Sequence, residues 1–297
     1  MKKFFERLTE KRILVSDGAW GTELFKCGLR AGECPELWNE QNKEEVFAIA
    51  KSYIDAGSDI ISTNSFGGSP VKLSHYNLQS KAYELNKTAA EISRQAAGDK
   101  LVMGSVGPTG KFLMSGDISS EELIESFSIQ VNALLDGGVD AILLETFYDI
   151  DEVECAVKAV RNFPEVPLIC SFTYDRNAIG EYRTMMGSTP KDVLKAMITL
   201  GVDVIGVNCG SGYHNMIDLV KELRDYSHNI PILVQPNAGL PETIEGKIVY
   251  SETPEVISDS VKRFLSIGVN IIGGCCGTTP EHIKIIRNTV DKFLSNQ

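Results

Sequence analysis

Short apolar runs rich in valine and isoleucine recur along the whole chain, and each is followed by a segment whose apolar residues have helical spacing. These runs predict eight strands, at residues 13–17, 59–64, 101–106, 141–146, 167–173, 204–209, 232–236 and 270–275. Strands that alternate with helices pair in parallel, because each return crossover is a helix. The recurrence shows no central change of composition. It therefore predicts a single domain that comprises residues 1–297. A closed (β/α)8 TIM barrel is favoured, and an open doubly wound sheet is the less favoured alternative.

A weak internal repeat supports this count of strands. In each copy a glycine ends a helical segment and the chain turns directly into a strand, at Gly57, Gly138, Gly201 and Gly268. Glycine commonly ends helices because it adopts the left-handed conformation without steric cost. The repeat thus marks strands two, four, six and eight.

Capping hydroxyls and long connections place the remaining features. A hydroxyl residue precedes proline or acidic residues at four points, which predicts helix starts after Ser119, Thr189, Thr253 and Thr279. The longest connections, residues 26–42, 107–119 and 175–188, all follow the C-terminal ends of predicted strands. In a (β/α)8 barrel this face carries the active site. Residues far apart in the sequence are thereby brought to one rim.

Composition excludes several classes of function. The formal net charge of -11 argues against nucleic acid, since a surface that follows phosphates needs clustered Lys and Arg. The first residues lack the apolar segment of a secretory signal, and no run approaches the ~20 apolar residues that span a bilayer. We therefore predict a cytoplasmic protein without a membrane partner. Seven cysteines, an odd number, fit a reducing compartment, where a thiol cluster indicates metal binding or catalysis instead of cross-links.

Three of the cysteines stand at predicted strand ends. Cys275 and Cys276 end the apolar run that begins at residue 271, and Cys209 ends a similar run that begins at residue 204. Three thiolates at one rim would form a soft tetrahedral zinc site with one open position, as in catalytic zinc centres. A structural zinc would need four protein ligands, and no fourth residue suggests itself nearby. His214, which follows Cys209 closely, is a weaker competing ligand. The remaining cysteines are interpreted as small buried apolar residues: Cys27, Cys34, Cys155 and Cys170.

The motifs along the chain resemble those of the homocysteine S-methyltransferase family, most closely the homocysteine-binding zinc barrel of cobalamin-dependent methionine synthase. The likeness extends over essentially the whole chain, through residues 17–23, 63–67, 107–110, 144–147, 208–209, 236–239 and 273–280. The Gly-Gly-Cys-Cys-Gly motif joined to one upstream Asn-Cys is specific, whereas any single glycine motif is not. The resemblance implies zinc on Cys209, Cys275 and Cys276, with the sulfur of homocysteine as a further ligand.

The resemblance also implies partners for the amino-acid part of homocysteine. Asp17 and Glu145 match the positions at which the family holds the substrate ammonium, and two carboxylates facing a cation make a charge-assisted clamp. From the residues alone, Asp17 could instead cap a helix, while Glu145 follows an apolar run in which a carboxylate needs a cation. Backbone amides of the glycine-rich loops are expected to bind the carboxylate. Second-rank candidates for substrate contacts are Asn64, Ser65, Phe66, Asn208 and Asn237.

The implied reaction is the methylation of homocysteine to methionine. A free thiol has a pKa of about 8.5, whereas coordination to zinc deprotonates it, so a nucleophilic thiolate forms without a separate base. The expected donor is methylcobalamin on a separate corrinoid protein. Residues 182–187 and 210–214 depart from the family pattern, which leaves betaine or S-methylmethionine as alternative donors and another small thiol as an alternative acceptor.

Two other classes of function remain open. A barrel lyase or aldolase would use a lysine at a strand end for a Schiff base, and the predicted strand ends offer none. A non-catalytic zinc-binding or thiol-binding module would keep the cysteines but lack turnover. Metal content separates the lyase from the other two classes, and methyl transfer separates the enzyme from the binding module.

Overall fold

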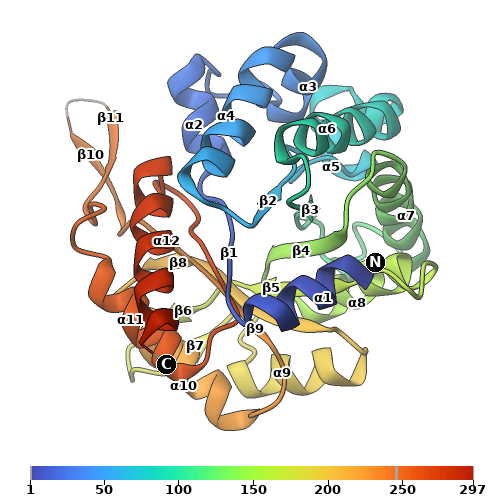
Figure 1. The fold of residues 1–297 in the computed structure, drawn as a ribbon. Helices are drawn as coiled ribbons and strands as arrows, with labels where there is room; N and C mark the ends of the chain where they lie inside the picture. Colours follow the sequence, from blue (N-terminus) through green and yellow to red (C-terminus); the bar gives the residue numbers. More distant parts are fainter. Residues whose placement is uncertain (1, 245–246, 297) are drawn as a thin grey trace.

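A computed structural model describes residues 2–244 and 247–296 (Figure 1). Eight strands form one parallel sheet in the order β1-β12-β9-β8-β5-β4-β3-β2, which follows the order of these strands along the chain. Their bounds are β1 Leu14–Val15, β2 Ile60–Ser62, β3 Leu101–Val106, β4 Ala141–Phe147, β5 Leu168–Phe172, β8 Val204–Gly212, β9 Ile232–Asn237 and β12 Ile271–Ile272. All eight predicted strands are present. The (β/α)8 TIM barrel is confirmed, whereas the assignment of residues 1–297 to a single domain stays a prediction.

The barrel closes between its first two strands. The backbone N–H of Asp59, just before β2, donates to the carbonyl of Val15 in β1 at 2.7 Å. The carboxylate of Asp59 accepts in return from the N–H of Val15 at 3.1 Å and from Arg287 at 2.9 Å. A backbone bond and a side-chain bond therefore join the same two residues across the seam.

The same pair of interactions, which we call a clasp, is found at the start of β2, β4, β8 and β12. These are the second, fourth, sixth and eighth strands of the barrel along the chain. The side chain of the residue before the strand accepts from a backbone N–H of the preceding strand and from an arginine of a helix. The glycine two residues earlier is in the left-handed conformation in each case. The four acceptor and arginine pairs are Asp59 with Arg287, Asp140 with Arg94, Asp203 with Arg161 and Asn270 with Arg224.

Helices surround the sheet (Figure 1). The α-helices are α1 Lys2–Lys11, α2 Trp20–Cys27, α3 Trp38–Gln41, α4 Lys43–Ala56, α5 Pro70–Leu73, α6 Ala82–Ala97, α7 Ser120–Asp136, α8 Ile150–Arg161, α9 Pro190–Thr199, α10 Ile217–Tyr226, α11 Ser258–Ile267 and α12 Pro280–Ser295. Short 3-10 turns are η1 Pro35–Leu37, η2 Ser74–Tyr76, η3 Gln79–Lys81 and η4 Leu113–Ser115. Ser119, Thr189 and Thr279 form capping boxes at α7, α9 and α12, as predicted.

The predicted helix start at Thr253 is wrong. Helix α11 begins at Ser258. The Thr253 hydroxyl instead donates to the Glu255 carboxylate at 2.7 Å, and the carbonyl of Thr253 accepts the N–H of Val256 in a turn. A local hydroxyl-to-carboxylate bond thus replaces the expected cap.

Two antiparallel hairpins that were not predicted from the sequence lie at the C-terminal end of the barrel. Strands β6 Asp175–Arg176 and β7 Tyr182–Arg183 lie in the long connection after β5. Strands β10 Pro241–Ile244 and β11 Lys247–Tyr250 follow β9, and this hairpin projects from the left of the molecule in Figure 1. Both hairpins follow the C-terminal ends of barrel strands, which is the face expected to carry the active site.

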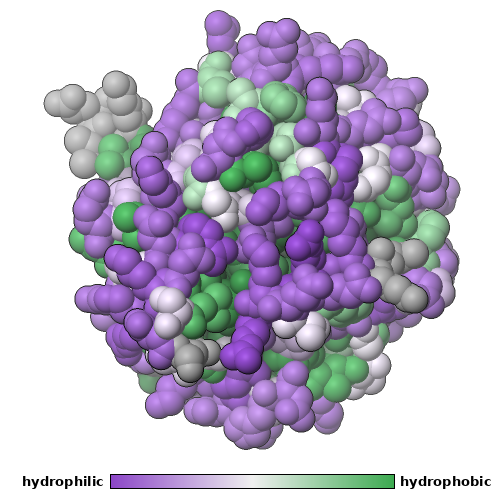
Figure 2. Space-filling model, in the orientation of Figure 1, coloured by the Kyte–Doolittle hydropathy of each residue, from purple (hydrophilic) through white to green (hydrophobic). Residues whose placement is uncertain are grey.

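The core has two layers that follow the alternation of side chains along the strands. One set fills the barrel interior and includes Leu14, Ile60, Leu101, Leu143 and Ile271. Phe4 and Leu8 of α1 join this set, so the first helix closes one end of the barrel. The other set, including Val15, Ile61 and Ile142, packs outward against the helices. Hydrophilic residues cover most of the face seen in Figure 2, where the apolar groups are small and separated.

Among the described residues, no helix is both long and apolar enough to cross a bilayer.

Candidate active site and metal centre

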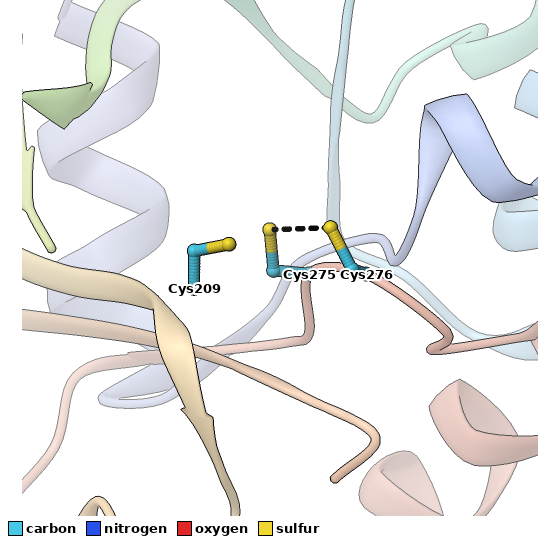
Figure 3. Close-up of side chains that lie close together, drawn as sticks. All are labelled: Cys209, Cys275 and Cys276. Atoms are coloured by element: carbon cyan, nitrogen blue, oxygen red, sulfur yellow. Dashed lines mark hydrogen bonds between the residues drawn. The ribbon is translucent and has the colours of Figure 1, made fainter. Parts of the chain in front are cut away.

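The three predicted metal ligands meet at one end of the barrel. Cys209 lies in β8, and Cys275 and Cys276 follow β12. Their Sγ atoms all lie within 4.8 Å of one another, with Cys275 and Cys276 4.0 Å apart, and Figure 3 shows the Cys209 side chain pointing toward the pair. Tetrahedral zinc with Zn–S bonds of about 2.3 Å places its sulfurs about 3.8 Å apart. The trio therefore fits one metal ion with little rearrangement.

The three thiols differ in pKa. Hydrogen bonds from Cys275 and then Cys276 lower the pKa of Cys209, while the same contact with Cys209 raises the pKa of Cys275 well above its ordinary value. One thiolate is thus stabilised by two neighbouring thiols. Thiolates are the form that binds metal.

The backbone at the site is unusual in two places. Thr146 and Cys209 have positive φ values of 62° and 59°, and each directly follows a predicted site residue, Glu145 or Asn208. A branched residue such as threonine in this region is a genuine outlier, and such conformations cost on the order of 1–3 kcal/mol. The strand register is also irregular here, between Leu144 and Phe147 in β4 and after Asn208 in β8. Bulges of this kind redirect side chains near active sites.

A cavity of about 290 Å³ lies against the cysteines. Ligand pockets usually measure ~300–1,000 Å³, so the space suits a small molecule. Residues 18–22, which lead into α2 and form its first turn, are part of the wall. No lysine or arginine is among the described residues that line it. The predicted site residues that line this cavity are Asn64, Ser65, Phe66, Glu145, Cys209, Cys275 and Cys276.

Glu145 supplies a carboxyl group to the cavity wall. Ser105 donates a hydrogen bond to its Oε1, and burial raises the pKa of this carboxyl to about 7, with a smaller contribution from the nearby charges of Asp17 and Cys209. No Lys or Arg is among the described residues that line the cavity or shift the pKa of this carboxyl. A carboxyl in this setting favours a cationic ligand.

Asp17 lies behind the cavity wall. Its side chain is fully buried, and it accepts from the N–H of Ser62 at 2.7 Å, from the Ser62 hydroxyl at 3.1 Å and from the Trp20 indole at 2.9 Å. Burial nevertheless raises the pKa of Asp17 to about 6. Asp17 therefore ties β1 to β2 and α2, and its predicted contact with the substrate ammonium stays a prediction.

The three neighbouring candidates after β2 have different surroundings. The Asn64 amide donates to the carbonyl of Pro35 at 2.8 Å and to Asn39 at 3.0 Å. The Ser65 hydroxyl donates to the carbonyl of Ser105 at 2.7 Å. Phe66 is 40% exposed and offers its ring to the cavity. Of the three, Phe66 has the side chain that is freest to meet a ligand.

Asn208 and Asn237 are buried beside the cysteines but do not line the cavity. The Asn237 side chain lies close to the Cys209 sulfur and lowers its pKa, and its Oδ1 is buried without a hydrogen-bond partner among the described residues. An unpaired buried oxygen next to a metal-ligand candidate is a group that a cation would satisfy. Asn208, in contrast, is fully engaged with protein groups, as described below.

Three residues at the site were missed by the sequence reading. Glu36, after α2, is buried in the cavity wall, where its Oε1 accepts from the N–H of Gly67 at 2.6 Å. Thr146 lines the cavity, and the ring of Tyr250 from the hairpin β10–β11 lies against Gly277, next to Cys276. Apolar residues at 244 and 248–250 flank the sequence Glu-Gly-Lys, and apolar runs on both sides of such a glycine segment are a hairpin signal that could have located Tyr250. Glu36 carries no such signal.

Fold and site together define a (β/α)8-barrel protein whose catalytic rim holds a three-cysteine centre beside a small acidic cavity. A family model described as homocysteine S-methyltransferase matches residues 14–290. The chain belongs to this family of enzymes.

Individual relatives agree with this assignment. Methionine synthase from Mycobacterium leprae is 30% identical over 299 residues, which cover 94% of this chain and 24% of that protein. Methionine synthase from Mycobacterium tuberculosis is also 30% identical, with 94% and 25% covered. The chain therefore spans about a quarter of the length of these curated relatives.

Solved structures show the same barrel. The homocysteine methyltransferase MmuM from Escherichia coli, in its metallated form, superimposes with a TM-score of 0.78 at 25% identity and covers 96% of this chain and 99% of that protein. Its oxidized form gives the same values. A relative of nearly the same extent thus has a metal-bound state.

Proposed function

We propose that the protein is a zinc-dependent homocysteine S-methyltransferase that forms methionine and takes its methyl group from methylcobalamin on a separate corrinoid protein. The observation that carries the proposal is the convergence of three Sγ atoms within 4.8 Å at the wall of a small cavity that also holds Glu145. The site thereby offers a place for a thiol and a place for an ammonium group. Homocysteine carries both.

The residues present fit zinc. Cys209, Cys275 and Cys276 would supply three sulfur ligands, and Asn237, beside Cys209, has a buried Oδ1 that finds no hydrogen-bond partner among the described residues. Soft ligands in this number suit zinc and leave one position for an exogenous group. When bound, zinc supplies a positive charge that keeps the homocysteine sulfur as a thiolate at neutral pH.

The cavity orients the rest of the substrate. The Glu145 carboxyl faces a space in which a substrate ammonium would be its cation, with Asp17 buried behind the wall as a second negative charge. The first turn of α2 lines the cavity, and its N-cap residue Ala19 makes no side-chain cap. N–H groups at a helix start bind carboxylates well. The substrate is thus held at its sulfur, its ammonium and its carboxylate.

Held in this way, the sulfur attacks the methyl carbon of the donor, and a carbon–sulfur bond forms as the bond from the methyl group to the donor breaks. Orientation of the reacting groups contributes part of the roughly 7–11 kcal/mol available to well-aligned reactions. The motif resemblance to the cobalamin-dependent methionine synthases favours methylcobalamin. A small onium donor, betaine or S-methylmethionine, is the second candidate, because residues 182–187 and 210–214 depart from the family pattern.

The test is to measure methionine formation in parallel with methylcobalamin, betaine and S-methylmethionine, together with the zinc content of the purified protein. We expect about one zinc per chain, product with one donor, and loss of both zinc and product in Cys276→Ala. Cys155→Ala, which removes a buried thiol away from the trio, is the matched control and should retain both. Full zinc occupancy without methionine from any donor would leave only a binding module.

A further inference from the structure

The Asn208 carboxamide has no bonding capacity left for a substrate. Its Oδ1 accepts from the N–H of Thr146 at 2.9 Å and from the Ser171 hydroxyl at 2.7 Å. Its Nδ2 donates to the Thr146 hydroxyl at 2.7 Å and contacts the Cys275 sulfur at 3.9 Å. An asparagine side chain has two acceptor sites and two N–H groups, so all four are used. The orientation of the amide is fixed, because the N–H of Thr146 can only donate.

These contacts join the two irregular strand ends of the site. Thr146 follows Glu145 at the bulge of β4, and Cys209 follows Asn208 at the bulge of β8. Both have left-handed backbones that non-glycine residues rarely adopt. Asn208 holds Thr146 by its backbone N–H and by its hydroxyl, so it fixes the unfavourable conformation through two bonds. Its contact with Cys275 adds the third segment of the site.

We propose that Asn208 is a positioning residue that sets the distance between the three-sulfur centre and the Glu145 carboxyl. It acts through Thr146 and the cysteines and does not touch the substrate, in contrast to the substrate contact that the sequence predicted for it. The inference rests on the proposed function, since it concerns where the thiol and ammonium of one small molecule are bound. Residues that orient metal ligands from behind commonly change metal affinity or activity 10- to 100-fold when replaced.

The test uses the full chain with Co²⁺ in place of zinc, because cobalt–thiolate absorption bands report the number and geometry of the sulfur ligands. In Asn208→Ala, we expect altered bands, metal affinity weakened by about 10-fold or more, and a raised KM for homocysteine. Asn270→Ala is the matched control, because it removes a carboxamide that also accepts a backbone N–H, at the opposite end of the barrel. The control should lower the unfolding temperature and leave the bands and the KM unchanged.

A second pair of variants covers the case in which Asn208→Ala does not fold. Thr146→Ser retains the hydroxyl that accepts from Asn208, whereas Thr146→Val keeps the branched shape and removes that acceptor. We expect Thr146→Ser to resemble the wild type and Thr146→Val to share the changes in bands and KM. Changed KM with unchanged bands would make Asn208 a substrate contact and overturn the inference. Lower thermal stability alone would also overturn it, and a wild type that binds no Co²⁺ would contradict the proposed function itself.

Discussion

Replacing Glu145 by glutamine should change how the stability of the metal-free protein depends on pH. Burial raises the pKa of this carboxyl from 4.5 to about 7 in the folded state. Below pH 4.5 the group is protonated in both the folded and the unfolded chain. As the pH rises toward 7, the unfolded chain ionises first, so the folded state progressively loses stability.

The magnitude follows from the size of that shift. A tenfold change in proton affinity corresponds to about 1.4 kcal/mol, so the wild type should lose about 3 kcal/mol of unfolding free energy from this group by pH 8. The Glu145 side chain lies at the cavity wall and is only partly enclosed, so screening by solvent makes this value an upper limit. Glu145→Gln cannot ionise. The free energy of unfolding of the variant, relative to wild type, should therefore increase with pH by up to about 3 kcal/mol.

Urea unfolding of chelator-treated protein at pH 4.5, 6 and 8 measures this difference directly. Asp17 titrates in both proteins, so its contribution cancels in the comparison. Glu154→Gln, on the exposed face of α8 where Glu154 pairs with Lys158 at 2.8 Å, controls for the loss of a surface charge. A difference between Glu145→Gln and wild type that stays constant from pH 4.5 to 8 would refute the assignment of a buried, unpaired carboxyl at this position.

Two further substitutions test other parts of the site. Asp17→Asn retains an acceptor for the N–H of Ser62 and removes the charge. The KM for homocysteine should rise about 10-fold or more, as expected for the loss of a charge-assisted contact worth about 1.4 kcal/mol, and the zinc content should stay the same. An unchanged KM would remove Asp17 from the substrate site. A Cβ on Gly277 would lie 2.2 Å from the Tyr250 ring, so Gly277→Ala should displace Tyr250 and lower the unfolding temperature more than Gly138→Ala, in which the backbone is equally left-handed but the space is open. Equal melting of these two variants would show that the ring is not fixed against Gly277.

The barrel could be predicted from the sequence because its strands are buried on both faces and therefore read as continuous apolar runs. Runs such as residues 101–106 coincide with strand β3 as observed. Strand ends are predicted less well: β12 covers only Ile271 and Ile272, whereas the apolar run predicts a strand over residues 270–275. The sequence therefore located the strands better than it located their limits.

The cysteine trio could also be predicted, since each thiol follows a recognisable strand and parallel strands end at one rim. The left-handed Thr146 could not, because local preference opposes that conformation and a side chain 62 positions away maintains it. For the same reason the sequence could not show that every hydrogen-bonding group of the Asn208 side chain is already used. Predictions about which residues touch the ligand therefore depended on contacts that only the fold creates.

The four clasps of Asp59, Asp140, Asp203 and Asn270 lie at the opposite end of the barrel from the cavity. Each clasp joins the start of one strand to its neighbour, whereas the cavity lies where the strands finish. Loops at the cavity end can thus lengthen, shorten or be exchanged without weakening the interactions that join neighbouring strands. A scaffold arranged in this way can change what its reactive end binds while the barrel stays closed.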